Sequence, residues 1–241
     1  MSNFVLIHGS WHDASAWDSV IKVLESNGHC AFAPTLAGHG KDAPRTISHA
    51  ECVASAVEFI TANNLKDFVL VGHSFGGTII TKVAEAVTDR IRRLVFWNAF
   101  VPLDGNSLSD ETPPHYRELF DKLAADGGDA GLMLPFNIWR DAFINDADEA
   151  FARSTYELLT PEPPRMFSDK LDLKKFYSLT IPRSYLNCTE DTALPPGEWG
   201  WHPRMSSRLG LYRLVQMPGS HEVIYTNPVG LAGKIIEAGR D

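Results

Sequence analysis

The 241-residue sequence predicts an α/β fold: a mostly parallel six-stranded sheet with helices on both faces and an inserted helical cap. Two observations predict this fold class. Short apolar runs alternate with segments of helical periodicity, which is typical of a parallel sheet covered on both faces. One interval between runs is far longer than the rest and is rich in proline, which indicates an insertion.

Six short apolar runs are the expected strands. They are 4–7, 30–34, 68–71, 94–101, 184–188 and 211–217. The expected helices between and after them are about 16–26, 48–63, 76–87 and 228–238. In 48–63 the apolar residues recur at spacings of three and four, which gives that helix one buried face.

The long interval follows the fourth run. We expect residues 1–101 and 183–241 to form the core and residues 102–182 to form the helical cap. Short helical patterns occur inside the interval, for example near 146–159. A structureless loop of this length would be improbable in a compact domain.

Composition excludes several classes of partner. Lys and Arg number 22 against 30 Asp and Glu, a net charge of −8, and no basic cluster occurs, which argues against nucleic-acid and membrane partners. No apolar run approaches the roughly 20 residues that span a bilayer. The chain enters its first strand at once, so we expect a cytoplasmic protein. Reduced thiols are expected at the three cysteines, and a homo-oligomer is left open.

Gly72-His73-Ser74-Phe75-Gly76 fits the pattern G-x-S-x-G, between an expected strand and an expected helix. A sharp strand–turn–helix needs small residues around the serine, because the turn is strained and packs closely. Ser74 is therefore the candidate nucleophile. The alternative is a Gly-rich turn with only a packing role. A phosphate loop is excluded because no Gly-Lys-Ser/Thr follows.

A serine hydroxyl needs a base, and the base needs a carboxylate to orient it. His221 follows the last expected strand, and Asp191 follows the one before it, so both should reach the same sheet edge as Ser74. The order Ser, acid, His is typical of one fold among those with this chemistry. Glu190 is the alternative to Asp191 as the acid. We favour Asp191, because its shorter side chain suits a fixed imidazole.

The oxyanion formed on attack needs preorganised donors. We assign them to the backbone N–H groups of Ser10, after the first strand, and of Phe75. The alternative is that His8 and His12 bind a metal, but they lie on a loop without an evident third ligand. Two further histidines are expected to orient loops rather than to act in catalysis: His39 and His73.

These segments resemble the α/β-hydrolases of a small branch that includes plant methylesterases and hydroxynitrile lyases. The resemblance rests on 4–9 (FVLIHG), 28–29 (GH), 70–77 (LVGHSFGG), 188–191 (CTED) and 219–221 (GSH). In that branch the aspartate of the Thr-Glu-Asp segment is the triad acid, which implies this role for Asp191. The α-type lyases carry Thr and Lys where this chain has Gly9 and Glu222, and a glutamate would repel departing cyanide. Dehalogenases and epoxide hydrolases of the fold carry Asp where Ser74 stands.

A narrower resemblance, at 37–41 (AGHGK) and 199–203 (WGWHP), is to bacterial esterases that hydrolyse the methyl carbamate carbendazim. The expected function is a serine hydrolase that cleaves a small carboxylic ester or carbamate through an acyl-enzyme, with no cofactor and no metal. The alternatives are a hydroxynitrile lyase or cofactor-free dioxygenase on the same fold, or a non-catalytic ligand receptor. The candidate substrate-binding residues are Trp11, His73, Trp139, Phe143, Tyr156 and Trp199.

Overall fold

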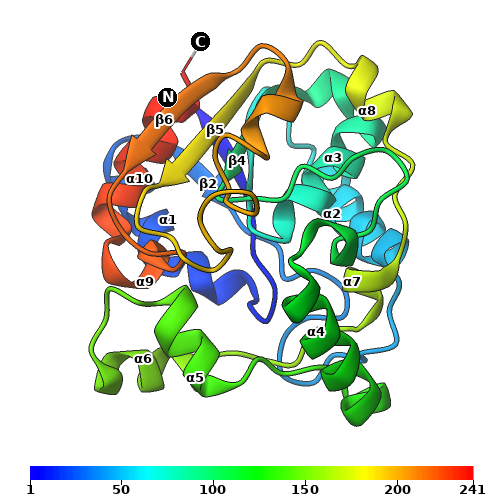
Figure 1. The fold of residues 1–241 in the computed structure, drawn as a ribbon. Coiled ribbons are helices and arrows are strands. Elements are labelled where there is room, and N and C mark those ends of the chain that lie inside the picture. Colours follow the sequence, from blue (N-terminus) through cyan, green and yellow to red (C-terminus); the bar gives the residue numbers. More distant parts are fainter. Residues whose placement is uncertain (241) are drawn as a thin grey trace.

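The computed structural model describes residues 1–240, and its centre is a six-stranded sheet in which every pair of neighbours is parallel (Figure 1). The order across the sheet is β2-β1-β3-β4-β5-β6. The strands are β1 (Asn3–Ile7), β2 (Cys30–Phe32), β3 (Phe68–His73), β4 (Ile91–Trp97), β5 (Arg183–Cys188) and β6 (Arg213–Met217). The predicted fold class is confirmed.

Helices cover both faces of this sheet. In β1, Phe4 and Leu6 pack with one set of buried residues and Val5 and Ile7 with the other, as the two-residue repeat of a strand requires. Figure 1 shows one helix group on the left, α1 (Asp18–Ser26) and α10 (Pro228–Ala238), and another on the right, α2 (His49–Ala62) and α3 (Gly76–Ala86). The sheet is therefore buried between two helical layers.

Local sequence signals explain where these helices begin. Ser48 and Glu51 form a capping box at the start of α2: the Ser48 hydroxyl accepts from the Glu51 N–H, and the Glu51 carboxylate accepts from the Ser48 N–H at 2.9 Å. At the start of α10 the Asn227 side chain accepts from the Gly230 N–H, and Pro228 occupies the first turn. At both helix starts, side chains thus accept hydrogen bonds from first-turn N–H groups that have no partner within the helix.

The segment between β4 and β5 holds five helices of its own. They are α4 (Pro114–Gly127), α5 (Phe136–Ile138), α6 (Glu149–Tyr156), α7 (Arg165–Ser168) and α8 (Lys174–Ser178). Figure 1 shows α4, α5 and α6 beyond the carboxyl ends of the strands, at the bottom of the view, where a cap would cover the sheet edge. α8 instead packs beside α3, where Glu85 accepts the Phe176 N–H at 3.0 Å. The last part of the inserted segment thus packs against a helix that covers the sheet.

The remaining short elements connect these parts. They are α9 (Val223–Thr226), the 3₁₀ turns Ala14–Trp17, Thr88–Arg90, Ser109–Glu111, Gly128–Ala130 and Ser206–Leu209, and the π-helical turn Trp139–Phe143. All three cysteines are unpaired. No helix in the described part of the chain has both the length and the apolar character to cross a bilayer.

Candidate active site

Ser74 lies on the turn between β3 and α3, in a left-handed conformation with φ of +54°. The turn leaves no room for a side chain two residues to either side of Ser74: a Cβ atom at Gly72 would lie 2.7 Å from the Gly76 carbonyl oxygen, and one at Gly76 would lie 2.8 Å from that of His8. The Ser74 N–H bonds to the Trp97 carbonyl at 3.2 Å, which continues the ladder towards β4. These contacts hold a strained backbone, the feature expected of a nucleophile on a strand–turn–helix.

His221 and Asp191 lie on the loops that follow β6 and β5. The imidazole Nδ1 is 2.6 Å from the Asp191 carboxylate, and both side chains are buried. The carboxylate is itself fixed, because it accepts from the Ala193 N–H at 2.8 Å and from the Asn98 amide. Glu190 instead accepts the Gly219 N–H at 3.1 Å. The geometry therefore puts Asp191, and not Glu190, on the imidazole.

Ser74 and His221 line the same cavity. Within the described part of the chain no hydrogen bond joins the serine hydroxyl to another group. Such catalytic contacts are often long until substrate binds, so the spacing does not disqualify the pair. Serine and imidazole share one cavity wall, and the carboxylate lies on the far nitrogen of the ring.

Two backbone amides lie close to Ser74 in the chain or at the cavity wall. Ser10 lines the cavity on the loop after β1, and Phe75 follows Ser74 directly. Neither N–H has a hydrogen-bond acceptor among residues 1–240, although Ser10 is buried. Buried amides without a partner are rare, and a pair beside a serine is what an oxyanion requires.

The imidazole of His221 is enclosed by aromatic rings. Trp201 stacks on it, with ring centroids 5.1 Å apart and an angle of 13°, and Phe143 meets it edge to face at 5.3 Å. His73 lies 4.6 Å away and bonds through Nε2 to the His221 carbonyl at 3.1 Å, so Nε2 carries the hydrogen. Burial and the neighbouring His221 keep the pKa of His73 well below its usual value. His73 is therefore a neutral support for the His221 loop.

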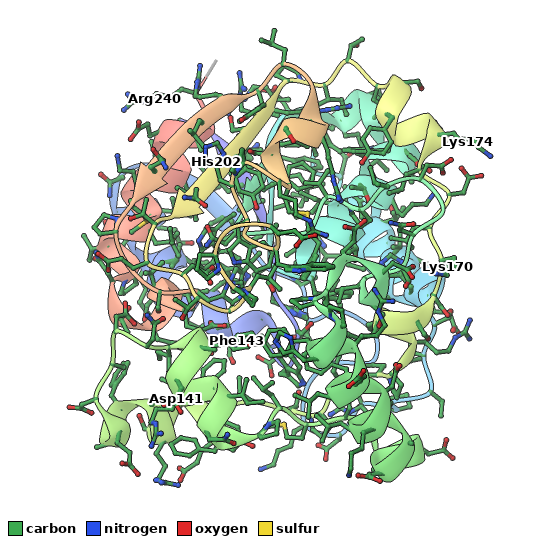
Figure 2. All side chains as sticks on the ribbon, in the orientation of Figure 1. Asp141, Phe143, Lys170, Lys174, His202 and Arg240 are labelled. Carbon is green, nitrogen blue, oxygen red and sulfur yellow. The ribbon has the colours of Figure 1, made fainter. Side chains whose placement is uncertain are left out.

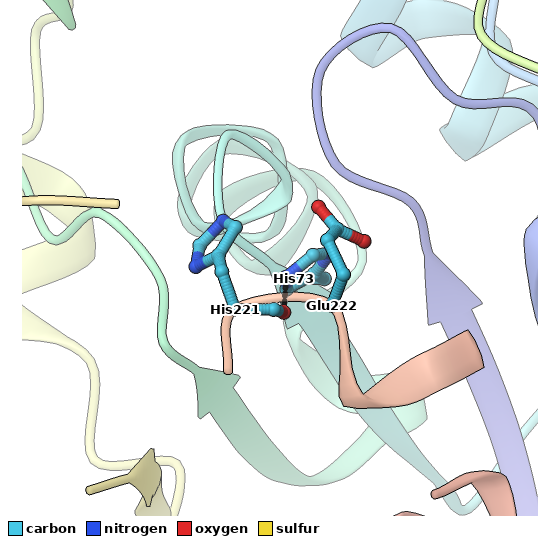
Figure 3. Close-up of side chains that lie close together, drawn as sticks. All are labelled: His73, His221 and Glu222. Atoms are coloured by element: carbon cyan, nitrogen blue, oxygen red, sulfur yellow. Dashed lines mark hydrogen bonds between the residues drawn. The ribbon is translucent and has the colours of Figure 1, made fainter. Parts of the chain in front are cut away.

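Figure 3 shows His73, His221 and Glu222 side by side. One potential ligand atom of each lies within 4.8 Å of the other two. One polar atom of each residue already faces a protein group: His73 Nε2 bonds to a carbonyl, His221 Nδ1 faces Asp191, and a Glu222 oxygen lies 3.3 Å from His12 Nε2. The cluster therefore fits proton and charge chemistry better than metal binding.

The other metal candidate, His8 with His12, has ring nitrogens that face other protein groups. His8 uses Nδ1 on the Gly9 carbonyl and Nε2 on the Leu36 N–H. His12 bonds to the Ser10 carbonyl and forms the ion pair with Glu222. Each imidazole is thus occupied by a different set of partners, and the two do not converge on one point.

Of the predicted substrate-binding residues, Trp11 and Phe143 line the cavity. Figure 2 shows Phe143 where the cap meets the sheet, whereas Asp141, from the same turn, lies on the outer side. The other four predicted residues do not line this cavity. Trp139 stacks behind Phe143, His73 stacks on Trp97, Tyr156 bonds to the Leu134 carbonyl, and Trp199 packs under Arg204.

Sequence reasoning missed several residues of the cavity wall. They are Phe100, Leu108, Thr112, Tyr116, Phe120, Phe167, Ala193, Leu194 and Trp201. Only Trp201 has a signal in the sequence, because it belongs to the segment 199–203, in which Trp199 is the predicted residue. The wall has no Asp, Glu, Lys or Arg side chain, so it fits an uncharged, apolar ligand.

Comparisons with known proteins agree with this geometry. The profile of the Alpha/beta hydrolase family matches residues 4–234. A carbendazim hydrolyzing esterase from Nocardioides sp. (strain SG-4G) is 29% identical over 99% of this chain and 100% of its own, and methylesterase 1 of Arabidopsis thaliana is 29% identical over 83% and 82%.

A solved structure is more similar still. It is an extracellular alpha/beta-hydrolase from a Paenibacillus species, described as sharing structural and functional homology with tobacco salicylic acid binding protein 2. It is 45% identical, with a TM-score of 0.98 over 100% of both chains. The cytoplasmic location of the present chain stays a prediction, since that relative is extracellular.

Proposed function

Because the chain belongs to the alpha/beta hydrolase family, we propose that it is a serine esterase in which Ser74, His221 and Asp191 act as nucleophile, base and orienting acid. The observation that carries the proposal is the 2.6 Å contact between Asp191 and His221 at a cavity that Ser74 also lines. The two unpaired amides beside the serine support it.

In the proposed reaction the Ser74 hydroxyl attacks an ester carbonyl while Nε2 of His221 takes its proton. Asp191 accepts the Nδ1–H bond and stabilises the imidazolium that forms. The Ser10 and Phe75 N–H groups donate to the oxyanion. The alcohol leaves with the proton from His221, and water then attacks the acyl-enzyme by the same steps in reverse. No cofactor or metal is required.

The proposed substrate is a small, neutral carboxylic ester or carbamate. An apolar wall without charged side chains favours an uncharged group, and the aromatic rings provide flat surfaces for packing. The similar Nocardioides protein is named for carbendazim hydrolysis, which motivates carbamates as test substrates. Nitrogen lone-pair donation makes a carbamate carbonyl less electrophilic, so the oxyanion donors should matter more for it than for an ester.

Lyase chemistry is disfavoured by the charge beside the base. Glu222 is buried next to His221, where a hydroxynitrile lyase of the α type carries a lysine for departing cyanide. A negative side chain at that position would raise the energy of an anionic leaving group. In ester hydrolysis the leaving alcohol takes a proton from His221 and departs neutral, so this step avoids that penalty.

The test is turnover of a panel of p-nitrophenyl esters, aryl amides and methyl carbamates by wild type, Ser74→Ala and the surface control Ser26→Ala. We expect ester turnover in wild type and the control, and its loss in Ser74→Ala. Full activity of Ser74→Ala would refute the proposal. Labelling of Ser74 by a fluorophosphonate without turnover would indicate a receptor, and uptake of labelled molecular oxygen a dioxygenase.

A further inference from the structure

Trp11 follows the oxyanion-hole residue Ser10, and the cap holds its backbone and its indole. The Trp11 N–H donates to the Glu162 carboxylate at 2.7 Å, and the Trp11 carbonyl accepts the Thr160 N–H at 2.8 Å. The indole N–H donates to the Leu132 carbonyl at 3.2 Å. All three partners belong to the segment inserted between β4 and β5, although they lie more than 120 residues away in the sequence.

The conformation that these bonds hold is unfavourable by itself. Trp11 has a φ of +64°, the left-handed region that a bulky residue rarely adopts. Such a backbone costs about 1–3 kcal/mol and persists only where its surroundings determine it. The contacts from the cap are therefore the cause of the Trp11 geometry.

This geometry is transmitted to the Ser10 amide through one rigid unit. Ser10 and Trp11 share a planar peptide group, whose carbonyl accepts from His12 Nδ1 at 2.7 Å and whose N–H donates to Glu162. With both ends held, only the two backbone torsions of Ser10 separate this plane from the Ser10 N–H. Release of either end would let the plane rotate and would change the direction of that N–H.

Glu162 is well placed to act as the anchor. Its side chain is fully buried, and its second carboxylate oxygen lies 3.0 Å from Nε2 of His39, which is tied to the Ala37 carbonyl. Its backbone exchanges two hydrogen bonds with Leu132, at 2.8 and 2.9 Å. Burial of a carboxylate costs desolvation free energy that an ion pair need not repay. A contribution to stability alone therefore does not explain why Glu162 is buried here.

We propose that Glu162 is a positioning residue that aims the Ser10 N–H at the oxyanion from its place in the cap. This inference rests on the proposed serine esterase function. It implies that docking of the cap completes the oxyanion hole, so the cap contributes to the rate as well as to the cavity wall.

Three substitutions separate reach from charge. Glu162→Gln keeps the length and an acceptor oxygen for the Trp11 N–H but removes the charge. Glu162→Asp keeps the charge but withdraws the oxygen by one methylene. Glu162→Ala removes both. The matched control is Glu85→Ala, because Glu85 also accepts a backbone N–H, that of Phe176, at the end of α3 remote from Ser74.

The readouts are kcat and KM for a p-nitrophenyl ester and the affinity for an aryl trifluoromethyl ketone. The ketone forms a bond to the Ser74 oxygen, the proton passes to His221, and the hemiketal oxyanion needs the hole. The corresponding trifluoromethyl carbinol has a similar shape but forms no adduct, so its affinity reports ground-state binding alone.

For Glu162→Ala and Glu162→Asp we expect kcat and ketone affinity to fall together by ~10- to 100-fold, with KM and carbinol affinity nearly unchanged. Glu162→Gln should lose only a few-fold. Equal effects of Glu162→Ala and Glu85→Ala, or a Glu162→Asp enzyme as active as wild type, would overturn the inference. If Glu162→Ala does not fold, comparison of Glu162→Gln with Glu162→Asp still tests the inference. A wild-type enzyme that neither hydrolyses the ester nor binds the ketone would instead refute the esterase function.

Discussion

Asp191→Asn tests the orientation of the base without a change of size. Asp191 accepts from His221, Asn98 and Ala193, and its side chain is fully buried. An asparagine can keep one oxygen on the Ala193 N–H, but its NH₂ group then faces the Asn98 amide and the imidazole. Asn98 cannot turn over freely, because its oxygen accepts the Cys188 N–H at 2.7 Å. The imidazole must then present a lone pair at Nδ1 and carry its hydrogen on Nε2.

In that tautomer His221 cannot take the Ser74 proton. We expect kcat for a p-nitrophenyl ester to fall by about 10⁴, or about 5.5 kcal/mol of activation free energy, with KM changed little. The assay is steady-state hydrolysis between pH 6 and 9, with a melting curve for each variant to show that the fold is retained.

The matched control is Glu190→Gln, whose side chain accepts the Gly219 N–H and does not reach the imidazole. It should keep kcat within a few-fold of wild type. The reasoning is refuted if Asp191→Asn retains more than about a tenth of wild-type kcat, or if Glu190→Gln is the more damaging change.

Three further predictions concern neighbouring features. Trp201→Ala removes the ring stacked on His221 and should lower kcat by about 3- to 30-fold through lost cation–π stabilisation of the imidazolium, whereas Trp201→Phe should recover part of it in the same esterase assay. Burial lowers the pKa of His49 to about 4, so between about pH 6.5 and pH 4 only the unfolded chain binds the proton. The free energy of unfolding of wild type should therefore fall by up to about 3 kcal/mol as the pH falls through this range. In urea titrations His49→Gln should lack this part of the loss. Gly77→Ala would put a Cβ 2.2 Å from the Phe100 carbonyl oxygen and should lower Tm by several degrees.

The sheet could be predicted because its signals are local. Each strand is a short apolar run. In β1, side chains alternate between the two faces of the sheet, so Phe4 and Leu6 lie in one buried cluster and Val5 and Ile7 in the other. Only the ends were wrong: β2 stops at Phe32, and β4 runs from Ile91 to Trp97 rather than on to residue 101. Asn98 leaves the strand with φ of +35° and turns its side chain to Asp191.

The cap and its contacts could not be predicted in the same way. α5 and α7 have three and four residues, too few for a periodic pattern, so tertiary packing decides where they form. Glu162 lies 151 residues from the Trp11 N–H that it accepts. Both members of that contact have ordinary sequence surroundings, and only the folded chain brings them together. The same holds for Trp201, because its position on the His221 ring depends on tertiary packing that its sequence neighbours do not reveal.

Convergence of Ser74, His221 and Asp191 is tested most directly by the acyl-enzyme. Under rapid mixing with p-nitrophenyl acetate, wild type should release about one equivalent of p-nitrophenol in a burst. Intact-mass and peptide analysis of the quenched enzyme should then find one acetyl group on Ser74, and none in Ser74→Ala. Two results would contradict this convergence. One is hydrolysis with the acetyl group on another residue. The other is the absence of any acetylated enzyme together with undiminished turnover in Ser74→Ala.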